Sequence, residues 1–429
     1  MNIMHRYPAS IVKRIAFCAS TALLCFTLSN SPSLAADLYA QKSATTSSTA
    51  MKARTPAINN DDFDGILAGG FIFYPQMEAQ TTYDDNVFRS HSNPTTDYIV
   101  DVIPGISATT NWNRHALGMS ANYDFGRYRN NSRSDYEGYN ISANGRYDIA
   151  YETNLSGRIE RNRKQAGATG FEDQSLAQDG YNTTTTEEAS LERHLSYIQS
   201  KVYIKNRQTD FAKLANNNYL SSHSKTYGLD IGYAFLPNSS IFSNATLDDL
   251  DYTKTNHLKR TSEGYDTRLG IKYDSGSLYN WSLFTGRLHK SFNDNIDDLN
   301  DNYLGGGFGW QATPLSRLDL SVDRKFLETT EESSVGIIQT TRKAIFTQSI
   351  TPFLNGTFTT GIDSYQYVAS DATEGRRNNV YYAGVGGNYK VSDTINLQVT
   401  YNSFRRDSSR SASDEYRNNQ VQISIIYRR

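Results

Sequence analysis

Large apolar residues alternate with polar or small ones along most of this chain from about residue 71 onward. The stretches 115–126, 227–235, 395–402 and 421–427 each place the large apolar residues mostly at odd positions. Successive side chains of a β-strand point to opposite faces, so a period of two predicts strands with one apolar and one polar face. The stretches are about 10–14 residues long, which exceeds the usual strand of a soluble sheet and suits a tilted strand crossing a bilayer.

The connections between these stretches alternate between very short turns and long polar loops. We expect the long loops near 84–97, 128–136, 163–182, 208–225, 250–263, 290–301, 327–340, 368–378 and 405–415. Eight short turns and nine long loops imply 18 strands, with both ends on the short-turn side. We therefore predict an all-β fold for residues 70–429: a transmembrane, up-and-down antiparallel β-barrel of about 18 strands with short periplasmic turns and long external loops.

The N-terminal part has a different character. Residues 1–35 combine a basic start, an apolar stretch at 15–28 and small residues before a cleavage point at Ala35. This order is typical of a cleavable signal peptide and predicts export to the bacterial outer membrane. Residues 36–69 are rich in Ser and Thr and predict a flexible periplasmic segment. Both cysteines lie within the signal peptide, so the mature chain is expected to form no disulfide.

The composition excludes other classes of protein. Aromatic residues make up 12 % of the chain, which argues against disorder, and the net charge of −2 gives no support to nucleic-acid binding. The 30 Tyr residues fit girdles at the two membrane interfaces. Candidates near strand ends are Tyr74, Tyr98, Trp112, Tyr128, Tyr197, Tyr279, Trp281, Tyr365 and Tyr367.

If the apolar face of each strand meets lipid, the polar face lines the lumen. The residues expected along a substrate path are Asp124, Arg146, Arg158, Glu160, Lys201, Lys205, Arg268, Lys272, Asp319, Asp323, Asn396 and Gln398. Both signs of charge are interleaved with amides, whereas a ring of one sign would select ions by charge. This mixture suits a hydrated chain or hydroxyl-rich solutes. The alternative is that these residues only cross-link the lumen walls.

The sequence offers little for catalysis or metal binding. The histidines show no metal-ligand spacing, and neither a Gly-x-Ser-x-Gly elbow nor a phosphate-binding glycine loop occurs. Two acidic clusters, at 248–251 and 294–301, match no calcium-loop spacing and are expected to be solvated loops. We predict a non-enzyme with no catalytic residues, no metal and no cofactor.

One succession of motifs points to a family. Tyr83, Asp84, Asp85 and Asn86 end the first long strand; Pro104-Gly105 and an Arg-His-Ala-Leu run at 114–117 follow. This order resembles the outer-membrane β-barrel porin family described as capsular or exopolysaccharide biosynthesis and export proteins, while later strands match it only by alternation. One departure is the end of the chain, Arg428-Arg429, where bacterial barrels usually end in an aromatic residue. From the residues alone, the rim motif 83–86 reads as a strand-ending turn or as a contact for emerging sugar hydroxyls.

The resemblance implies a conduit that exports an exopolysaccharide or capsular polysaccharide. Its implied partners are outer-membrane lipid, the polysaccharide and a periplasmic and inner-membrane export machinery. Two alternatives remain open: a general or nutrient-specific porin for small hydrophilic solutes, and a structural or adhesive surface barrel with a blocked lumen. The sequence leaves the oligomeric state open.

Overall fold

The computed structural model describes residues 65–165, 181–212, 221–252, 261–276, 278–293, 296–329, 334–369, 376–410 and 412–429. These residues form nineteen β-strands and two short 3-10 helices, η2 (Ser132–Ser134) and η4 (Ala412–Asp414). The strands are β1 (Ile66–Ala68), β2 (Phe71–Asp84), β3 (Asp97–Thr110), β4 (Ala116–Tyr128), β5 (Tyr136–Ala150), β6 (Thr153–Gln165), β7 (Tyr181–Leu195), β8 (Ile198–Ala212), β9 (Ser222–Leu236), β10 (Ser239–Tyr252), β11 (Ser262–Asp274), β12 (Tyr279–Phe292), β13 (Leu299–Thr313), β14 (Ser316–Leu327), β15 (Ser334–Thr351), β16 (Leu354–Ala369), β17 (Arg377–Lys390), β18 (Ile395–Ser408) and β19 (Tyr416–Arg428).

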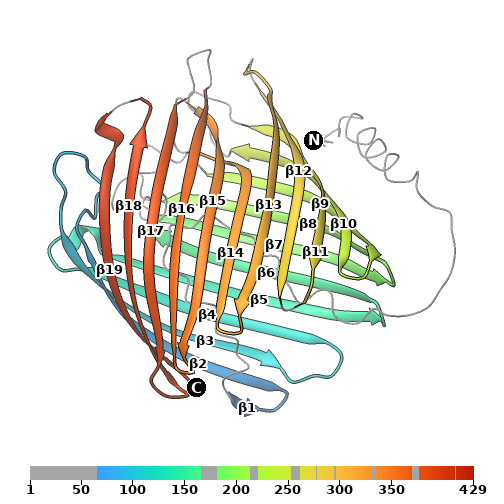
Figure 1. The fold of residues 1–429 in the computed structure, drawn as a ribbon, viewed down its shortest axis with the longest axis horizontal. Coiled ribbons are helices and arrows are strands. Elements are labelled where there is room, and N and C mark those ends of the chain that lie inside the picture. Colours follow the sequence, from blue (N-terminus) through green and yellow to red (C-terminus); the bar gives the residue numbers. More distant parts are fainter. Residues whose placement is uncertain are drawn as a thin grey trace, which may run out of the picture. The chain divides into compact units, whose positions relative to one another are not determined.

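Strands β2 to β19 close into one antiparallel barrel (Figure 1). Each strand pairs with the next along the chain, and β19 returns to β2 in a register that runs from Gln420 opposite Asp84 to Arg428 opposite Gln76. The predicted all-β, 18-stranded antiparallel barrel is therefore confirmed. Closure removes the free edges of the sheet, which is the condition a sheet must meet inside lipid. Among the described residues, no helix is both long and apolar enough to span a membrane.

The two ends of the barrel differ in their connections. Both the start of β2 and the end of β19 lie at the end with short turns, where the amide of Arg429 donates to the carbonyl of Pro75 at 3.1 Å. We call the opposite end the long-loop end. The loop predicted at 327–340 is partly wrong, because β14 runs to Leu327 and β15 already begins at Ser334. Residues 334–340, predicted as part of the loop, belong instead to β15 and are buried for a reason given below.

A short hairpin precedes the barrel. Ile66, Leu67 and Ala68 of β1 pair with the first residues of β2 across a Gly69-Gly70 turn, and the positive φ of Gly69, 62°, is easily reached without a Cβ. This end of the segment predicted as flexible, 36–69, is therefore a strand. The predicted signal peptide and the rest of that segment lie outside the described residues.

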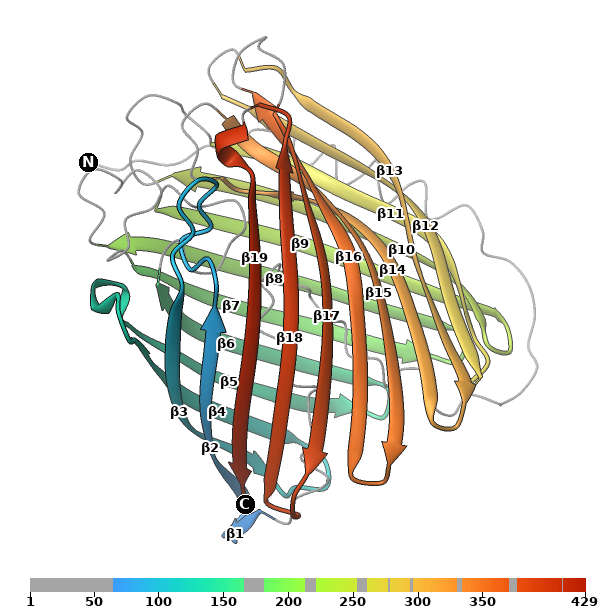
Figure 2. The same cartoon turned by 60° about the vertical axis from the view of Figure 1, so that its left-hand side comes forward.

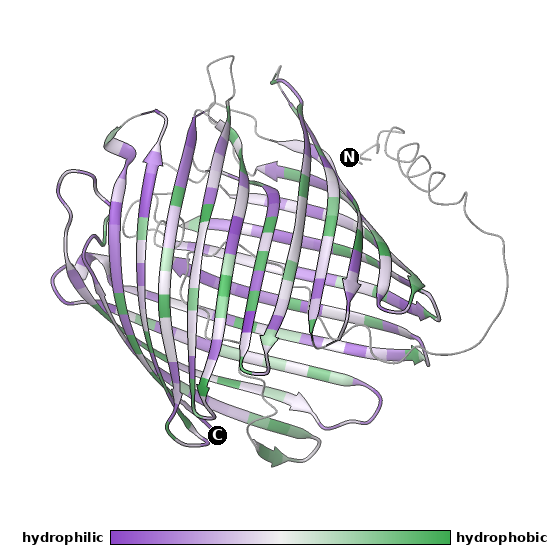
Figure 3. Ribbon diagram, viewed as in Figure 1, coloured by the Kyte–Doolittle hydropathy of each residue, from purple (hydrophilic) through white to green (hydrophobic). Residues whose placement is uncertain are grey.

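Hydrophilic and hydrophobic residues follow one another along the strands of the barrel wall (Figure 3), and their side chains point to different faces. In β18 the side chains of Val399 and Tyr401 are exposed on the outside, whereas Gln398, Thr400 and Asn402 are buried on the inside. The same parity passes from strand to strand through the register, so residues opposite each other share a face. The outward face therefore carries the apolar side chains that lipid requires.

The aromatic girdle was predicted only in part. Exposed aromatic side chains on the outside include Tyr98, Trp112, Tyr197, Tyr279 and Trp281. Tyr365 and Tyr367 are instead buried inside the barrel, and the Tyr128 ring also lies inside, next to Tyr136 at 6.4 Å between centroids. Nearness to a strand end suggested girdle positions, but the parity of each residue in its strand decides the face.

Aromatic rings on the lumen face repeatedly lie over a glycine of the neighbouring strand. The directly opposed pairs are Tyr136 with Gly126, Tyr203 with Gly228, Tyr303 with Gly286, Tyr382 with Gly361, Phe242 with Gly270 and Phe284 with Gly305. A Cβ added at any of these glycines would come within 3.0 Å of the ring. Each ring can therefore lie along the wall instead of projecting across the lumen.

Candidate substrate path

The rim motif closes the barrel seam. One carboxylate oxygen of Asp84 accepts hydrogen bonds from the Asn418 side chain at 2.5 Å and from the amide of Asn86 at 2.8 Å, and the other accepts from the Gln420 side chain at 2.7 Å. Asp84 and Asn418 are both buried. The last residue of β2 is thus joined by charge-assisted hydrogen bonds to the strand that completes the barrel.

The next two motif residues extend the same contact. Asp85 accepts from the backbone amide and from the side chain of Asn419, each at 2.7 Å. The Asn86 side chain donates to the carbonyl oxygens of Ser90 at 2.8 Å and Arg417 at 2.9 Å. The polar groups of the motif thus bind β19 and the following loop at the end of β2.

Tyr83 has the opposite parity and contacts the ring of Tyr98 on the outside, with 5.2 Å between centroids. It therefore faces away from the lumen.

The first group of predicted lumen residues lies on the inner face of β4 to β8. Asp124 is on β4, Arg146 on β5, Arg158 and Glu160 on β6, and Lys201 and Lys205 on β8. Four of them, Arg146, Arg158, Glu160 and Lys201, form short-range ion pairs. Arg158 contacts Glu160 at 2.7 Å, Arg146 contacts Asp148 at 3.0 Å, and Lys201 contacts Glu188 at 3.4 Å. Positive and negative charges therefore lie side by side on this part of the lumen wall, and neither sign dominates.

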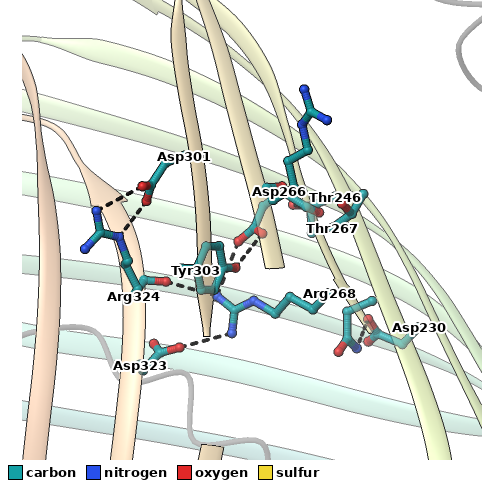
Figure 4. Close-up of polar contacts among 11 residues, drawn as sticks. Asp230, Thr246, Asp266, Thr267, Arg268, Asp301, Tyr303, Asp323 and Arg324 are labelled. Carbon is teal, nitrogen blue, oxygen red and sulfur yellow. Dashed lines mark hydrogen bonds and ion pairs between the residues drawn. The ribbon is translucent and has the colours of Figure 1, made fainter. Parts of the chain in front are cut away.

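A second group meets at the inner face of β11 to β14 (Figure 4). Arg268 contacts Asp266 at 3.3 Å on its own strand and reaches Asp323 of β14 at 3.2 Å. Tyr303 donates to Asp266 at 2.6 Å. Arg324 binds Asp301 through two nitrogens, at 2.5 and 3.0 Å. Sequence reasoning selected Arg268 and Asp323, but not the residues that join them.

Two further predicted residues face inward nearer the short-turn end. Lys272 lies on β11 opposite Ser240 and Ser282. Asp319 of β14 binds the guanidinium of Arg317 at 2.7 to 3.0 Å. This ion pair is within one strand, so it orders both side chains along the wall.

The inner faces of β18 and β19 are rich in amides and hydroxyls. Asn396 and Gln398, both predicted, are buried there in line with Thr400 and Asn402. On the neighbouring strand the Gln422 side chain donates to Ser424 at 3.2 Å. Such groups both donate and accept hydrogen bonds, so they can replace water around a sugar hydroxyl.

The structure revises the prediction for the acidic clusters. Asp248 lies within β10 on the inner face and is ion-paired with Lys290, and Asp301 lies within β13 and binds Arg324. These carboxylates are strand residues with cationic partners, not solvated loop residues. Asp294 lies outside the described residues. Within the described ranges there is no group of three or more His, Cys, Asp or Glu side chains that could hold a metal ion.

The sequence argument missed the aromatic residues of the lumen wall. Tyr136, Tyr203, Tyr303 and Tyr382 each lie over a glycine and face inward. Alternation alone could have signalled Tyr203, which stands between Lys201 and Lys205 with the same parity. This position was not recognised because tyrosines were expected at the membrane interfaces.

A closed barrel with a polar interior and an apolar exterior defines an outer-membrane, porin-like barrel. The chain belongs to the family described as Putative beta-barrel porin 2, whose model matches residues 62–429. The protein is therefore placed in the outer membrane. A search of curated proteins found no match.

Comparison with solved structures finds several outer-membrane proteins similar to this chain. The outer membrane protein OpdK from Pseudomonas aeruginosa is 12 % identical, with 83 % of this chain and 98 % of that chain covered and a TM-score of 0.49. A ferric enterobactin receptor mutant from the same organism is 7 % identical over 85 % of this chain and 82 % of that chain, with a TM-score of 0.47. A bacterial polysaccharide outer membrane secretin is 7 % identical over 83 % of this chain and 98 % of that chain, with a TM-score of 0.39.

Proposed function

We propose that this barrel is a conduit through which an exopolysaccharide or capsular polysaccharide leaves the cell. The observation that carries the proposal is the set of tyrosine rings lying over glycines on the lumen wall, combined with the amides and hydroxyls of β18 and β19. Aromatic faces contact the apolar face of a sugar ring, and amides replace water at its hydroxyls. Together they offer many weak contacts, which a moving chain needs.

The lumen charges fit the same role. Because Arg146, Arg158 and Lys201 are each paired with a carboxylate at 2.7 to 3.4 Å, these charges present no strong net field to a neutral or mixed solute. In this proposal the barrel performs no covalent chemistry and uses no cofactor. The driving force comes from a periplasmic and inner-membrane machinery that delivers the polymer.

A second candidate is a porin for small hydrophilic solutes. One observation favours it: Glu328, directly after β14, accepts a hydrogen bond from Ser222 of β9 at 3.2 Å, so this end of β14 lies across the inner wall and narrows the passage at the long-loop end. A narrow passage admits small solutes more easily than a polymer chain.

The two candidates differ in two measurements. Deletion of the gene should remove surface polysaccharide if the barrel exports it, and should leave it unchanged if the barrel is a nutrient porin. In planar bilayers, polysaccharide fragments added to the purified protein should interrupt the ion current for an exporter. A barrel that carries no current and whose loss leaves the polysaccharide unchanged would instead be a structural or adhesive surface protein.

A further inference from the structure

The ladder between β13 and β14 stops halfway. It runs from Thr313 opposite Ser316 to Gly306 opposite Val322, and no pairing continues toward the long-loop end. The pairing of β14 with β15 does continue, as far as Leu327 opposite Ile337. The long-loop half of β14 therefore separates from β13, while β15 stays paired with both β14 and β16. We call residues 323–329 and 334–340 the arm.

The arm lies inside the barrel. Arg324 has the same parity as Leu320 and Val322, which are exposed on the outside, yet its guanidinium binds Asp301 on the inner face of β13. The outward face of β14 is thus turned against the inner face of its neighbour, as Figure 4 shows for the Arg324–Asp301 contact.

Two further contacts place the arm across the inner wall. The Phe326 ring lies 6.3 Å from the ring of Phe292, an inward residue of β12. The Ser222 hydroxyl, at the start of β9, donates to the Glu328 carboxylate at 3.2 Å. Since β9 is five strands away from β14 along the wall, the arm passes over the inner face of the strands between them.

Burial agrees with this position. All seven residues from Ser334 to Thr340 are buried, including Ile337 and Ile338, which point to opposite faces of β15. Ile337 packs with Tyr365 and Tyr367 of β16 on the inner face. A strand buried on both faces is expected inside the lumen and not in a wall that separates lipid from water.

Side chains hold the arm in this place. Arg268 of β11 contacts Asp323 at 3.2 Å and donates to the backbone carbonyl of Arg324 at 3.4 Å, a group that the ladder with β13 does not reach. The guanidinium of Arg324 binds Asp301 of β13, and within the arm it donates to the hydroxyl of Thr340, opposite it on β15, at 2.9 Å. We call the contacts of Arg268 with the arm, and of Arg324 with Asp301, the latch.

The part of β13 next to the arm could pair with it. In the register already present, Gly305 would stand opposite Asp323, and Leu304 opposite Arg324. Strand β14 separates from β13 next to Gly305-Gly306-Gly307 of β13. Because these three residues have no side chains, β14 can change direction there. Completing the ladder would exchange the ion pairs of the latch for backbone hydrogen bonds, so two arrangements of the same sequence compete.

We propose that the arm is a gate: it narrows the passage when the latch holds it inside, and it opens the passage by completing the β13–β14 ladder. This inference rests on the proposed function in that it assigns the conduit a closed and an open state. The movement itself requires only the described strands.

Disulfide cross-links test the two states. All variants carry Cys18→Ser and Cys25→Ser, because these are the two cysteines of the sequence. The pair Ser222→Cys with Glu328→Cys joins the arm to β9 and fixes the closed state. The pair Leu304→Cys with Arg324→Cys joins residues that meet only when the ladder is complete. Phe308→Cys with Leu320→Cys, already opposite each other, is the matched control for a disulfide between β13 and β14.

We expect all three pairs to form in the outer membrane, as measured by gel mobility with and without reductant. In planar bilayers the closed pair should lower the single-channel conductance several-fold when oxidised, the open pair should raise it, and reductant should reverse both changes. The control pair should leave it unchanged. The gate is overturned if the open pair stays reduced while the control pair forms, or if neither disulfide changes the conductance of a conducting protein. If no variant conducts, cross-linking still decides whether the arm moves, and it is the conduit function that fails.

Discussion

The ring of Tyr303 lies directly over Gly286 on the inner wall of the barrel, and its hydroxyl donates to Asp266 at 2.6 Å. The tyrosine ring can occupy this position only because residue 286 is a glycine: any Cβ there would overlap the ring. The same relationship recurs with Tyr136, Tyr203 and Tyr382, so it is a regular device of this lumen.

Gly286→Ala is expected to displace the Tyr303 ring and to lower the free energy of unfolding by about 1–3 kcal/mol, the usual cost of an added methyl group without space. Urea titration of the protein in phospholipid vesicles, followed by tryptophan fluorescence, measures this loss. Gly387→Ala is the matched control, because nothing lies within 4 Å of a Cβ at that position. Equal stability of the two variants would show that the ring does not need the glycine.

The seam contact of Asp84 predicts a large loss of stability. Asp84→Ala would leave Asn418, Gln420 and the amide of Asn86 without their acceptor, and hydrogen bonds to a charged group contribute about 1.5–3 kcal/mol each. We expect a loss of at least about 3 kcal/mol and earlier unfolding on heating, seen as a shift in gel mobility at lower temperature.

The control for the seam is Asp393→Ala in a short turn. Asp393 is 90 % exposed and contacts Lys390 at 2.9 Å, and such surface pairs contribute about 0–1 kcal/mol. If Asp84→Ala behaved like this control, the motif would not be what holds β2 to β19.

Alternation predicted the strands, the turns and the faces because lipid and water impose a period of two on every strand. It could not predict the arm. The residues at 335–338, Val-Gly-Ile-Ile, are apolar without alternation, which is unusual for an external loop and was the available signal. Their burial depends on Tyr365 and Tyr367, which are distant in sequence. The side chains that bind Asp84 could not be predicted either, because Asn418 and Gln420 lie on β19, more than 300 residues later in the sequence.

The paired charges of β6 predict an ion selectivity that one substitution can change. Arg158 faces the lumen and contacts Glu160 at 2.7 Å, so Arg158→Glu would leave two like charges side by side on the passage. We expect the ratio of cation to anion permeability to rise several-fold, measured as the reversal potential in a salt gradient across a planar bilayer.

Arg161→Glu is the control for selectivity, because residue 161 is on the same strand with the opposite parity and lies opposite the outward Ile141. The same change of charge outside the lumen should leave the reversal potential unchanged. A comparable shift in both variants would mean that the current does not pass along the inner face of β6.

The assignment of one face to lipid predicts an asymmetry between neighbours on β5. Ile141 is exposed on the outside, whereas Asn144 has the opposite parity and faces the lumen. Ile141→Arg should lower the free energy of unfolding in vesicles by about 1 kcal/mol, because a charge on the lipid face loses hydration and the native Arg161 lies opposite on the same face, as expected near an interface. Asn144→Arg places the same charge in the aqueous lumen and should change stability by no more than about 0.5 kcal/mol. Both variants are measured by urea titration in vesicles and again in detergent micelles, where the difference should shrink because water reaches the outer face more easily. If Asn144→Arg proved the more costly of the two in vesicles, the faces of β5 would be assigned the wrong way round, and so would those of the strands whose parity follows from its register.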